Sequence, residues 1–130
     1  MKVKKTVPFS FVLDELESLQ PYTKPMFGCT AIYVDEKIML ILRDREKHPE
    51  DNGIWVATTP EHHASLRKLF PALRSITVFG PGETGWQVLP SDDLNFEETA
   101  LKICGLVSKR DPRIGKTPVR KKASGRSLKR

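Results

Sequence analysis

The sequence contains little cysteine and no long hydrophobic run, and these absences exclude several classes of protein. Its two cysteines, Cys29 and Cys104, form no C-x-x-C pair, so we interpret both as small buried side chains rather than as a disulfide or metal ligands. No apolar run approaches the roughly 20 residues that a membrane-spanning helix needs. No apolar segment of the secretory type follows the charged start at residues 1–5. We therefore expect a cytoplasmic protein that does not enter a membrane.

Catalytic and cofactor motifs are also missing. His62 and His63 are adjacent, whereas a zinc-binding helix uses i, i+4 spacing, so they favour an exposed helical turn over a metal site. The glycine-rich segment 80–85 lacks the Lys-Ser/Thr pair of a phosphate-binding loop, and a strand is expected after it. The carboxylates at 92–93 and 97–98 surround a predicted helix start, where capping and the helix dipole account for them. We expect no enzymatic activity, no cofactor and no metal ion.

Basic charge is concentrated at the C-terminus. Residues 109–130 contain ten Lys or Arg and one Asp, a charge of +9, whereas residues 1–108 contain twelve basic and fifteen acidic residues, a charge of −3. We expect one folded domain, 1–108, and a disordered basic tail, 109–130. The tail has no aromatic residue for base stacking, so it either contacts phosphate backbones non-specifically or only keeps the protein soluble. The candidate nucleic-acid contacts are Lys116, Arg120, Lys121, Lys122, Arg126, Lys129 and Arg130.

Hydrophobic periodicity and turn signals predict three helices and five strands. Their expected order is a helix at 10–20, strands at 30–34, 38–42 and 54–58, a helix at 59–70, strands at 75–79 and 86–89, and a helix at 95–107. Asn95 and Glu98 have the spacing of a capping box at the start of the last helix. Because the connections between consecutive strands are short, the sheet is expected to be antiparallel. The fold class is α+β, a two-layer sandwich of a five-stranded antiparallel sheet with its helices on one face and its other face open.

The segment Pro25–Gly28, followed by the strand Ile32–Val34, a short turn and an apolar strand, resembles the N-terminal domain of the TfoX/Sxy family. The strand that begins at Trp86, with the helix after it, is similar to the related MmcQ/YjbR proteins. The resemblance covers residues 11–107 and implies the order α-β(3)-α-β(2)-α of a secretion-chaperone-like fold. It also implies a regulatory role, since TfoX proteins are associated with the control of DNA-uptake competence, and it carries no catalytic residue.

Met26, Phe27 and Gly28 admit two interpretations. They either form an exposed lip that binds a partner, or they bring the chain into the sheet with Phe27 packed in the core. In the first interpretation the anchors are Met and aromatic side chains, which carry much of the energy of protein interfaces. The candidate partner-binding residues are Met26, Phe27, Gly28, Tyr33, Trp55 and Trp86.

The leading hypothesis is a non-enzymatic regulatory or adaptor domain. It would bind a protein partner, or a second copy of itself as a homodimer, through the open sheet face and the edge strands. The first alternative is a nucleic-acid-associated protein that uses the basic tail. The second alternative is a small-ligand-binding protein or an enzyme of unknown reaction, which a deep pocket lined by groups with perturbed pKa values would favour.

Overall fold

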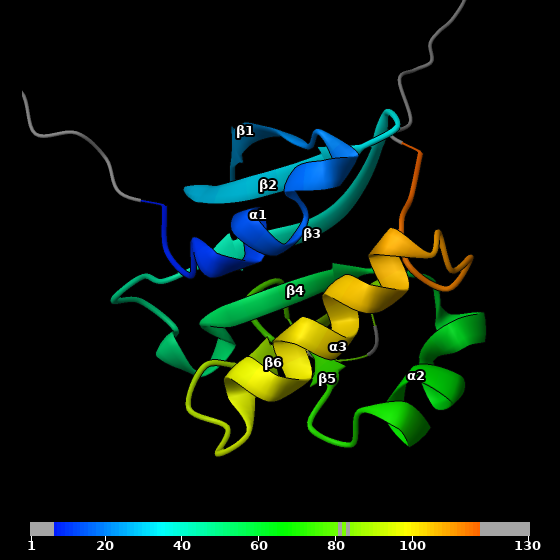
Figure 1. The fold of residues 1–130 in the computed structure, drawn as a ribbon. Coiled ribbons are helices and arrows are strands. Elements are labelled where there is room, and N and C mark those ends of the chain that lie inside the picture. Colours follow the sequence, from blue (N-terminus) through cyan, green and yellow to red (C-terminus); the bar gives the residue numbers. More distant parts are fainter. Residues whose placement is uncertain (1–6, 81, 83, 118–130) are drawn as a thin grey trace, which may run out of the picture.

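A computed structural model of the chain defines residues 7–80, 82 and 84–117. Six antiparallel strands form one sheet in the order β1-β2-β3-β4-β6-β5 (Figure 1). The prediction of an α+β fold with an antiparallel sheet is confirmed, whereas the predicted count of five strands is wrong. The strands are β1 Tyr22–Met26, β2 Cys29–Val34, β3 Lys37–Arg43, β4 Gly53–Ala57, β5 Arg74–Ser75 and β6 Trp86–Pro90.

The additional strand is β1, over residues where the periodicity predicts no strand. It pairs with β2 from Tyr22↔Tyr33 to Met26↔Cys29 and forms one edge of the sheet. In a hairpin with a two-residue turn, the residue pair next to the turn is hydrogen-bonded. Non-hydrogen-bonded and hydrogen-bonded pairs then alternate along the two strands. The N–H positions of Pro25 and of Pro21, just before the strand, therefore point away from β2. A proline is tolerated there because the ladder loses no hydrogen bond.

The strand predicted at 75–79 is shorter than expected. Only Arg74–Ser75 pairs with β6, through Arg74↔Val88 and Ser75↔Gln87. The residues that follow pack their apolar side chains against the face of the sheet, where Ile76 is buried and Val78 is half-buried. The alternating pattern therefore reflects a segment that lies across the sheet rather than within it.

The described residues form three α-helices, the longest of 13 residues. They are α1 Phe11–Glu15, α2 His63–Leu69 and α3 Phe96–Ser108, with 3-10 turns η1 Glu17–Leu19, η2 Pro49–Asp51 and η3 Pro60–His62. The helix predicted at 10–20 is thus divided into α1 and η1. The predicted apolar stripe of α3 is buried, and α3 begins directly after Asn95. The predicted capping box is wrong, because Asn95 makes no side-chain cap; the carbonyl oxygen of Asp93 accepts the Phe96 amide instead.

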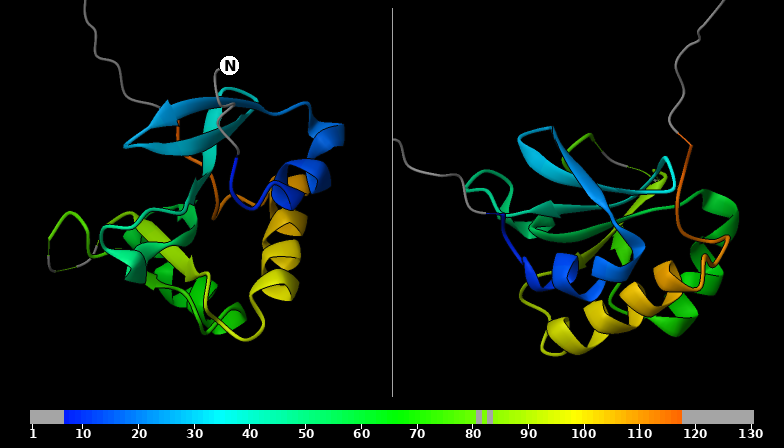
Figure 2. Two further views of the ribbon diagram at one scale, coloured as in Figure 1. Left: turned by 90° about the vertical axis from the view of Figure 1, so that its left-hand side faces the viewer. Right: turned by 45° about the horizontal axis from the view of Figure 1, so that its top comes forward.

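Both faces of the sheet carry a hydrophobic core. On one face, Leu40, Leu42 and Val56 pack with residues of all three helices. The other face was expected to be open, but Trp55 is only 1% exposed there and Tyr33 5% exposed. The sheet is strongly twisted, and both the β1–β2 hairpin and the loop after β5 lie on the side away from α1 and α3 (Figure 2). The expectation of an open face is therefore wrong, because these segments cover much of it.

Residues 109–117 belong to the folded unit. Ile114 is buried in the helix-side core. Lys116 and Ile38 exchange two backbone hydrogen bonds of 3.0 Å, and the Gly115 amide donates to the Ala57 carbonyl over 2.8 Å. The prediction of disorder from Lys109 onward is therefore wrong for residues 109–117. Residues 118–130 lie outside the described residues.

Candidate functional site

The tip of the β1–β2 hairpin holds Phe27 in an unusual conformation. Phe27 and Gly28 are the two turn residues, with φ values of 56° and 73°, the pattern of a type I′ turn. This left-handed region is favourable for Gly and tolerable for Asn, but it strains a bulky aromatic residue. Phe27 is nevertheless 51% exposed. The alternative in which Phe27 packs in the core is therefore wrong.

Four aromatic side chains form a continuous row that begins at this tip, and we call Phe27, Phe79, Trp55 and Trp86 the aromatic surface. The Phe27 and Phe79 rings meet edge to face at 5.1 Å between centroids, and Phe79 meets Trp55 in the same way at 5.9 Å. Trp86 lies 5.9 Å from Trp55. Phe27 and Phe79 are both about half exposed, Trp86 is half-buried, and Trp55 is the buried base of the row.

Phe79 is held in place by a buried carboxylate that the sequence reasoning missed. Asp51 is fully buried, and its Oδ2 accepts the amides of Thr77 and Val78, each over 2.8 Å. Its Oδ1 lies 3.0 Å from Arg74 Nη1. Burial alone would raise the pKa of Asp51, but the hydrogen bonds from Thr77, Arg74 and Val78 outweigh it and hold that pKa below its ordinary value.

The hairpin tip is fixed by a second contact, from the loop between β3 and β4. Arg45 Nη1 donates to the carbonyl oxygen of Phe27 over 2.9 Å. Asn52 holds the backbone of Arg45 through two hydrogen bonds, one to its amide and one to its carbonyl. A Cβ atom on Gly28 would lie 2.4 Å from Arg45 Nη1, so glycine is needed here both for its positive φ and for the approach of Arg45.

The structure separates the predicted partner-binding residues into two groups. Met26, Phe27, Gly28 and Trp86 are accessible at least in part, whereas Tyr33 and Trp55 are buried. Tyr33 stacks on Tyr22 at 5.0 Å. Sequence reasoning missed Phe79 because it was assigned to a regular strand. An aromatic residue directly before the turn-rich segment 80–85 was the only signal for its position.

Of the predicted nucleic-acid contacts, only Lys116 lies within the described residues. It is half-buried, and its backbone is paired with Ile38. The others, Arg120, Lys121, Lys122, Arg126, Lys129 and Arg130, lie outside the described residues.

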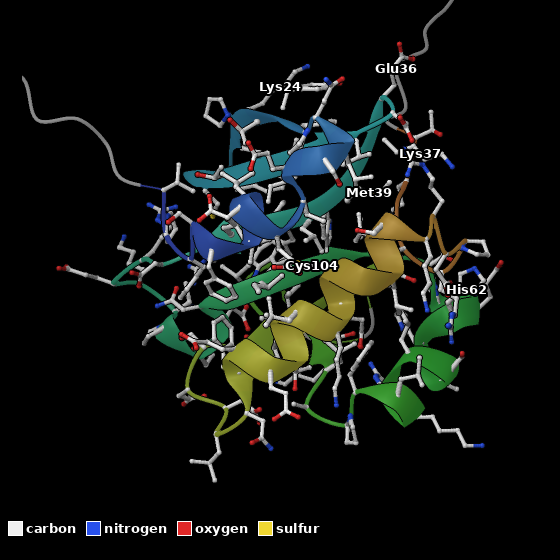
Figure 3. The ribbon with its side chains drawn as sticks, viewed as in Figure 1. Lys24, Glu36, Lys37, Met39, His62 and Cys104 are labelled. Atoms are coloured by element: carbon white, nitrogen blue, oxygen red, sulfur yellow. The ribbon has the colours of Figure 1, made fainter. Side chains whose placement is uncertain are left out.

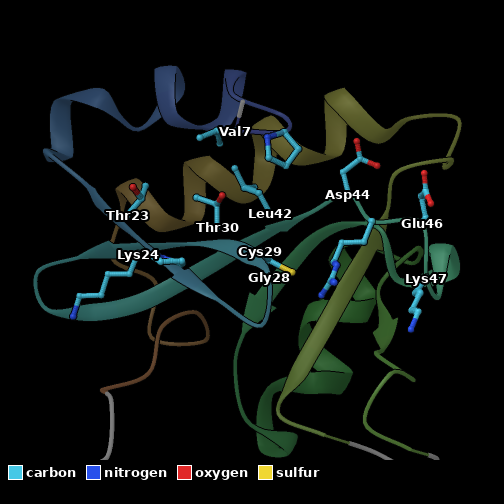
Figure 4. Close-up of a pocket in the computed structure, with 13 residues that line it drawn as sticks. Val7, Thr23, Lys24, Gly28, Cys29, Thr30, Leu42, Asp44, Glu46 and Lys47 are labelled. Carbon is cyan, nitrogen blue, oxygen red and sulfur yellow. The ribbon is translucent and has the colours of Figure 1, made fainter. Parts of the chain in front are cut away.

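A groove of about 900 Å³ lies beside the hairpin (Figure 4). Its wall includes Thr23, Thr30, Leu42 and Cys29. Burial raises the pKa of the Cys29 thiol more than the charges of Arg43 and Arg45 lower it, so the thiol is protonated at neutral pH and is a poor nucleophile. The groove offers space for a ligand, and its Cys29 thiol is not an activated nucleophile.

The second cysteine is further from solvent. Cys104 lies on α3 next to α1 (Figure 3). Burial, with a smaller effect of the nearby Glu15 carboxylate, raises the pKa of Cys104 to about 12. Among residues 7–80, 82 and 84–117, no three His, Cys, Asp or Glu side chains are grouped closely enough to hold a metal ion. No helix in the described part of the chain is both long and apolar enough to cross a membrane.

Comparison with known proteins adds no relative. No protein-family model, no curated protein and no solved structure matches this chain. The similarity to the TfoX/Sxy family therefore stays a prediction.

Proposed function

We propose that this protein is a non-enzymatic, cytoplasmic regulatory or adaptor domain of the TfoX N-terminal-like type, which binds a protein partner through the aromatic surface. The observation that supports the proposal is the combination of backbone conformation and solvent exposure at Phe27. This residue adopts a strained backbone conformation, yet about half of its side chain remains exposed. Relief of this strain by Asn or Gly would offset most of what the half-exposed ring contributes to the fold, so stability gives little preference for a Phe at this position. Strain of this kind concentrates at functional sites.

The partner is expected to bind by inserting side chains rather than by adding a strand. The outer edge of β1 lacks N–H donors at Pro25 and Pro21, which discourages pairing with another strand. The opposite edge, β5, is two residues long and is tied to Asp51 through Arg74. We therefore favour a different protein over a homodimer.

The test uses the full chain and two single variants. Phe27→Asn removes the ring and suits the positive φ, whereas Leu94→Ala removes an apolar side chain that is 99% exposed in the loop before α3. Each protein is used to capture partners from native cell extract, and each captured protein is purified and retested as a binary pair. The proposal expects a partner that binds the wild type and Leu94→Ala but binds Phe27→Asn at least about fivefold more weakly.

Equal binding of that partner to all three proteins would refute the role of the aromatic surface. An extract that yields nucleic acid but no protein would refute the proposed partner class. Size-exclusion chromatography of the purified chain tests whether the partner is a second copy. A stable dimer that the Phe27→Asn substitution dissociates would show that the aromatic surface binds another copy of this chain rather than a different protein.

A second candidate function is binding of nucleic acid through the basic tail. It is favoured by charge, since residues 118–130 contain six basic and no acidic residues. The test is a DNA titration at two salt concentrations with the full chain and with a chain that ends at Thr117. Truncation at Ser108 is unsuitable because it would remove the buried Ile114. Binding that is salt-sensitive and lost on truncation supports this function, and no binding by either chain removes it.

A further inference from the structure

A guanidinium group lies directly beside the exposed rings of the aromatic surface. Arg45 is exposed, and its contact with the Phe27 carbonyl uses one of the five N–H donors that a guanidinium carries. Among the described residues, no carboxylate forms an ion pair with Arg45. Its backbone is held by Asn52, so this positive charge is fixed before any partner arrives.

The acidic residues next to Arg45 in the sequence point elsewhere. Figure 4 shows the side chains of Asp44 and Glu46 directed away from Gly28, whereas the guanidinium of Arg45 lies against Gly28. Among the described residues, the charged group that contacts the tip of the hairpin is therefore the Arg45 guanidinium, and an acidic ligand would complement it.

From this arrangement we infer that the partner presents a carboxylate beside a large apolar side chain. The apolar side chain packs on Phe27 and Phe79, and the carboxylate receives paired hydrogen bonds from the free N–H groups of Arg45. The inference rests on the proposed function, because it names the chemistry of the protein segment that the aromatic surface takes.

The packing of the rings favours a peptide over a single-stranded nucleic acid. Bases stack on aromatic faces that are open and flat. Phe79 makes edge-to-face contacts with both Phe27 and Trp55, so the rings are engaged with one another. Such a row suits an aliphatic or aromatic side chain that inserts at its rim.

The experiment measures binding of two short fluorescein-labelled peptides to the full chain by fluorescence anisotropy. One peptide consists of Asp, Glu, Leu and Phe, and the other has the same sequence with Asn and Gln in place of the acids. The protein variants are Arg45→Gln, Arg45→Lys and, as a matched control, Lys68→Gln on the exposed side of α2. Thermal unfolding of each variant confirms that it is folded.

The wild type and Lys68→Gln are expected to bind the acidic peptide at least about tenfold more tightly than the neutral one, which corresponds to about 1.4 kcal/mol. Arg45→Gln is expected to remove most of this preference, and Arg45→Lys to restore part of it, because Lys keeps the charge but lacks the planar fork. Phe27→Asn is expected to weaken both peptides.

Three results would overturn the inference. The first is that the wild type binds the two peptides with equal affinity and that Phe27→Asn weakens the binding of both. This result would support the proposed function and refute only the inference that the partner presents a carboxylate. The second is a preference for the acidic peptide that Arg45→Gln does not change. The third is no binding of either peptide while an oligo(dT) strand binds in an Arg45-dependent way, which would assign the surface to nucleic acid and remove the proposed function as well.

Discussion

Replacing Phe27 by Asn should separate stability from binding. The exposed ring would be lost, and with it the contact to Phe79. The backbone, however, would gain, because Asn visits the left-handed region at little cost. We therefore expect a variant that folds almost as well as the wild type but no longer binds the partner.

The magnitude follows from two opposing terms. An edge-to-face aromatic pair contributes about 0.5–1.5 kcal/mol, and burial of roughly half a Phe side chain contributes about 1 kcal/mol more. Against this loss, Asn tolerates the left-handed conformation better than Phe, which raises the free energy of unfolding by about 1–2 kcal/mol. The free energy of unfolding of Phe27→Asn should thus lie within about 1.5 kcal/mol of the wild type, whereas Trp55→Ala, in the buried base of the row, should lose about 3–5 kcal/mol.

Urea denaturation followed by tryptophan fluorescence and circular dichroism measures these differences. Phe27→Ala serves as the matched control, since Ala loses the same ring but keeps the strained backbone. It should be less stable than Phe27→Asn by about 1 kcal/mol. If Phe27→Asn is destabilised as strongly as Trp55→Ala, then Phe27 is a structural residue and the reasoning that makes it a binding residue fails.

Three further predictions concern the parts that hold the fold and the aromatic surface. A chain that ends at Thr117 should unfold with the same free energy as the full chain to within about 0.5 kcal/mol, whereas a chain that ends at Ser108 should lose at least about 2 kcal/mol with the buried Ile114, as measured by urea denaturation. Asp51→Asn should lose about 3 kcal/mol, because it leaves Arg74 without its buried partner, and it should change the fluorescence of Trp55 as residues 76–79 loosen. The free energy of unfolding should also fall in acid. In the folded protein the pKa of Asp51 is lowered, and hydrogen bonds from Arg113 lower the pKa of Asp111 to about 2. Both carboxylates therefore stabilise the fold at pH values above their unfolded pKa near 3.8, and this stabilisation is lost as the pH falls from about 4 toward 2.

Each of these predictions has a result that would contradict it. Equal stability of the two truncated chains would mean that residues 109–117 do not contribute to the core. An Asp51→Asn variant with wild-type stability and fluorescence would remove Asp51 as the residue that positions Phe79. A free energy of unfolding that stays constant from pH 5 down to about 2 would show that neither carboxylate is stabilised in the folded state.

The sequence alone determined most of the elements. Alternating or continuous apolar runs located β2, β3, β4 and β6, and a helical stripe located α3, because these patterns depend on residues that are close along the chain. The same local signals marked Met26, Phe27 and Gly28 as a distinctive turn. They could not decide whether Phe27 faced the core or solvent, since that depends on what lies across the sheet.

Only the tertiary structure decided the rest. β1 is a strand because its prolines face an outer edge, which depends on the order of strands in the sheet. Phe79 reaches Phe27 because Asp51 accepts the amides of Thr77 and Val78 and so holds residues 76–79 across the sheet. Asp51 lies more than twenty residues earlier in the sequence. Ile114 is buried for the same kind of reason, since β3 and β4 supply backbone partners for residues that would be too polar to fold alone. Contacts between residues distant in sequence leave no periodic pattern, so the aromatic surface became visible only after the twist of the sheet had brought its members together.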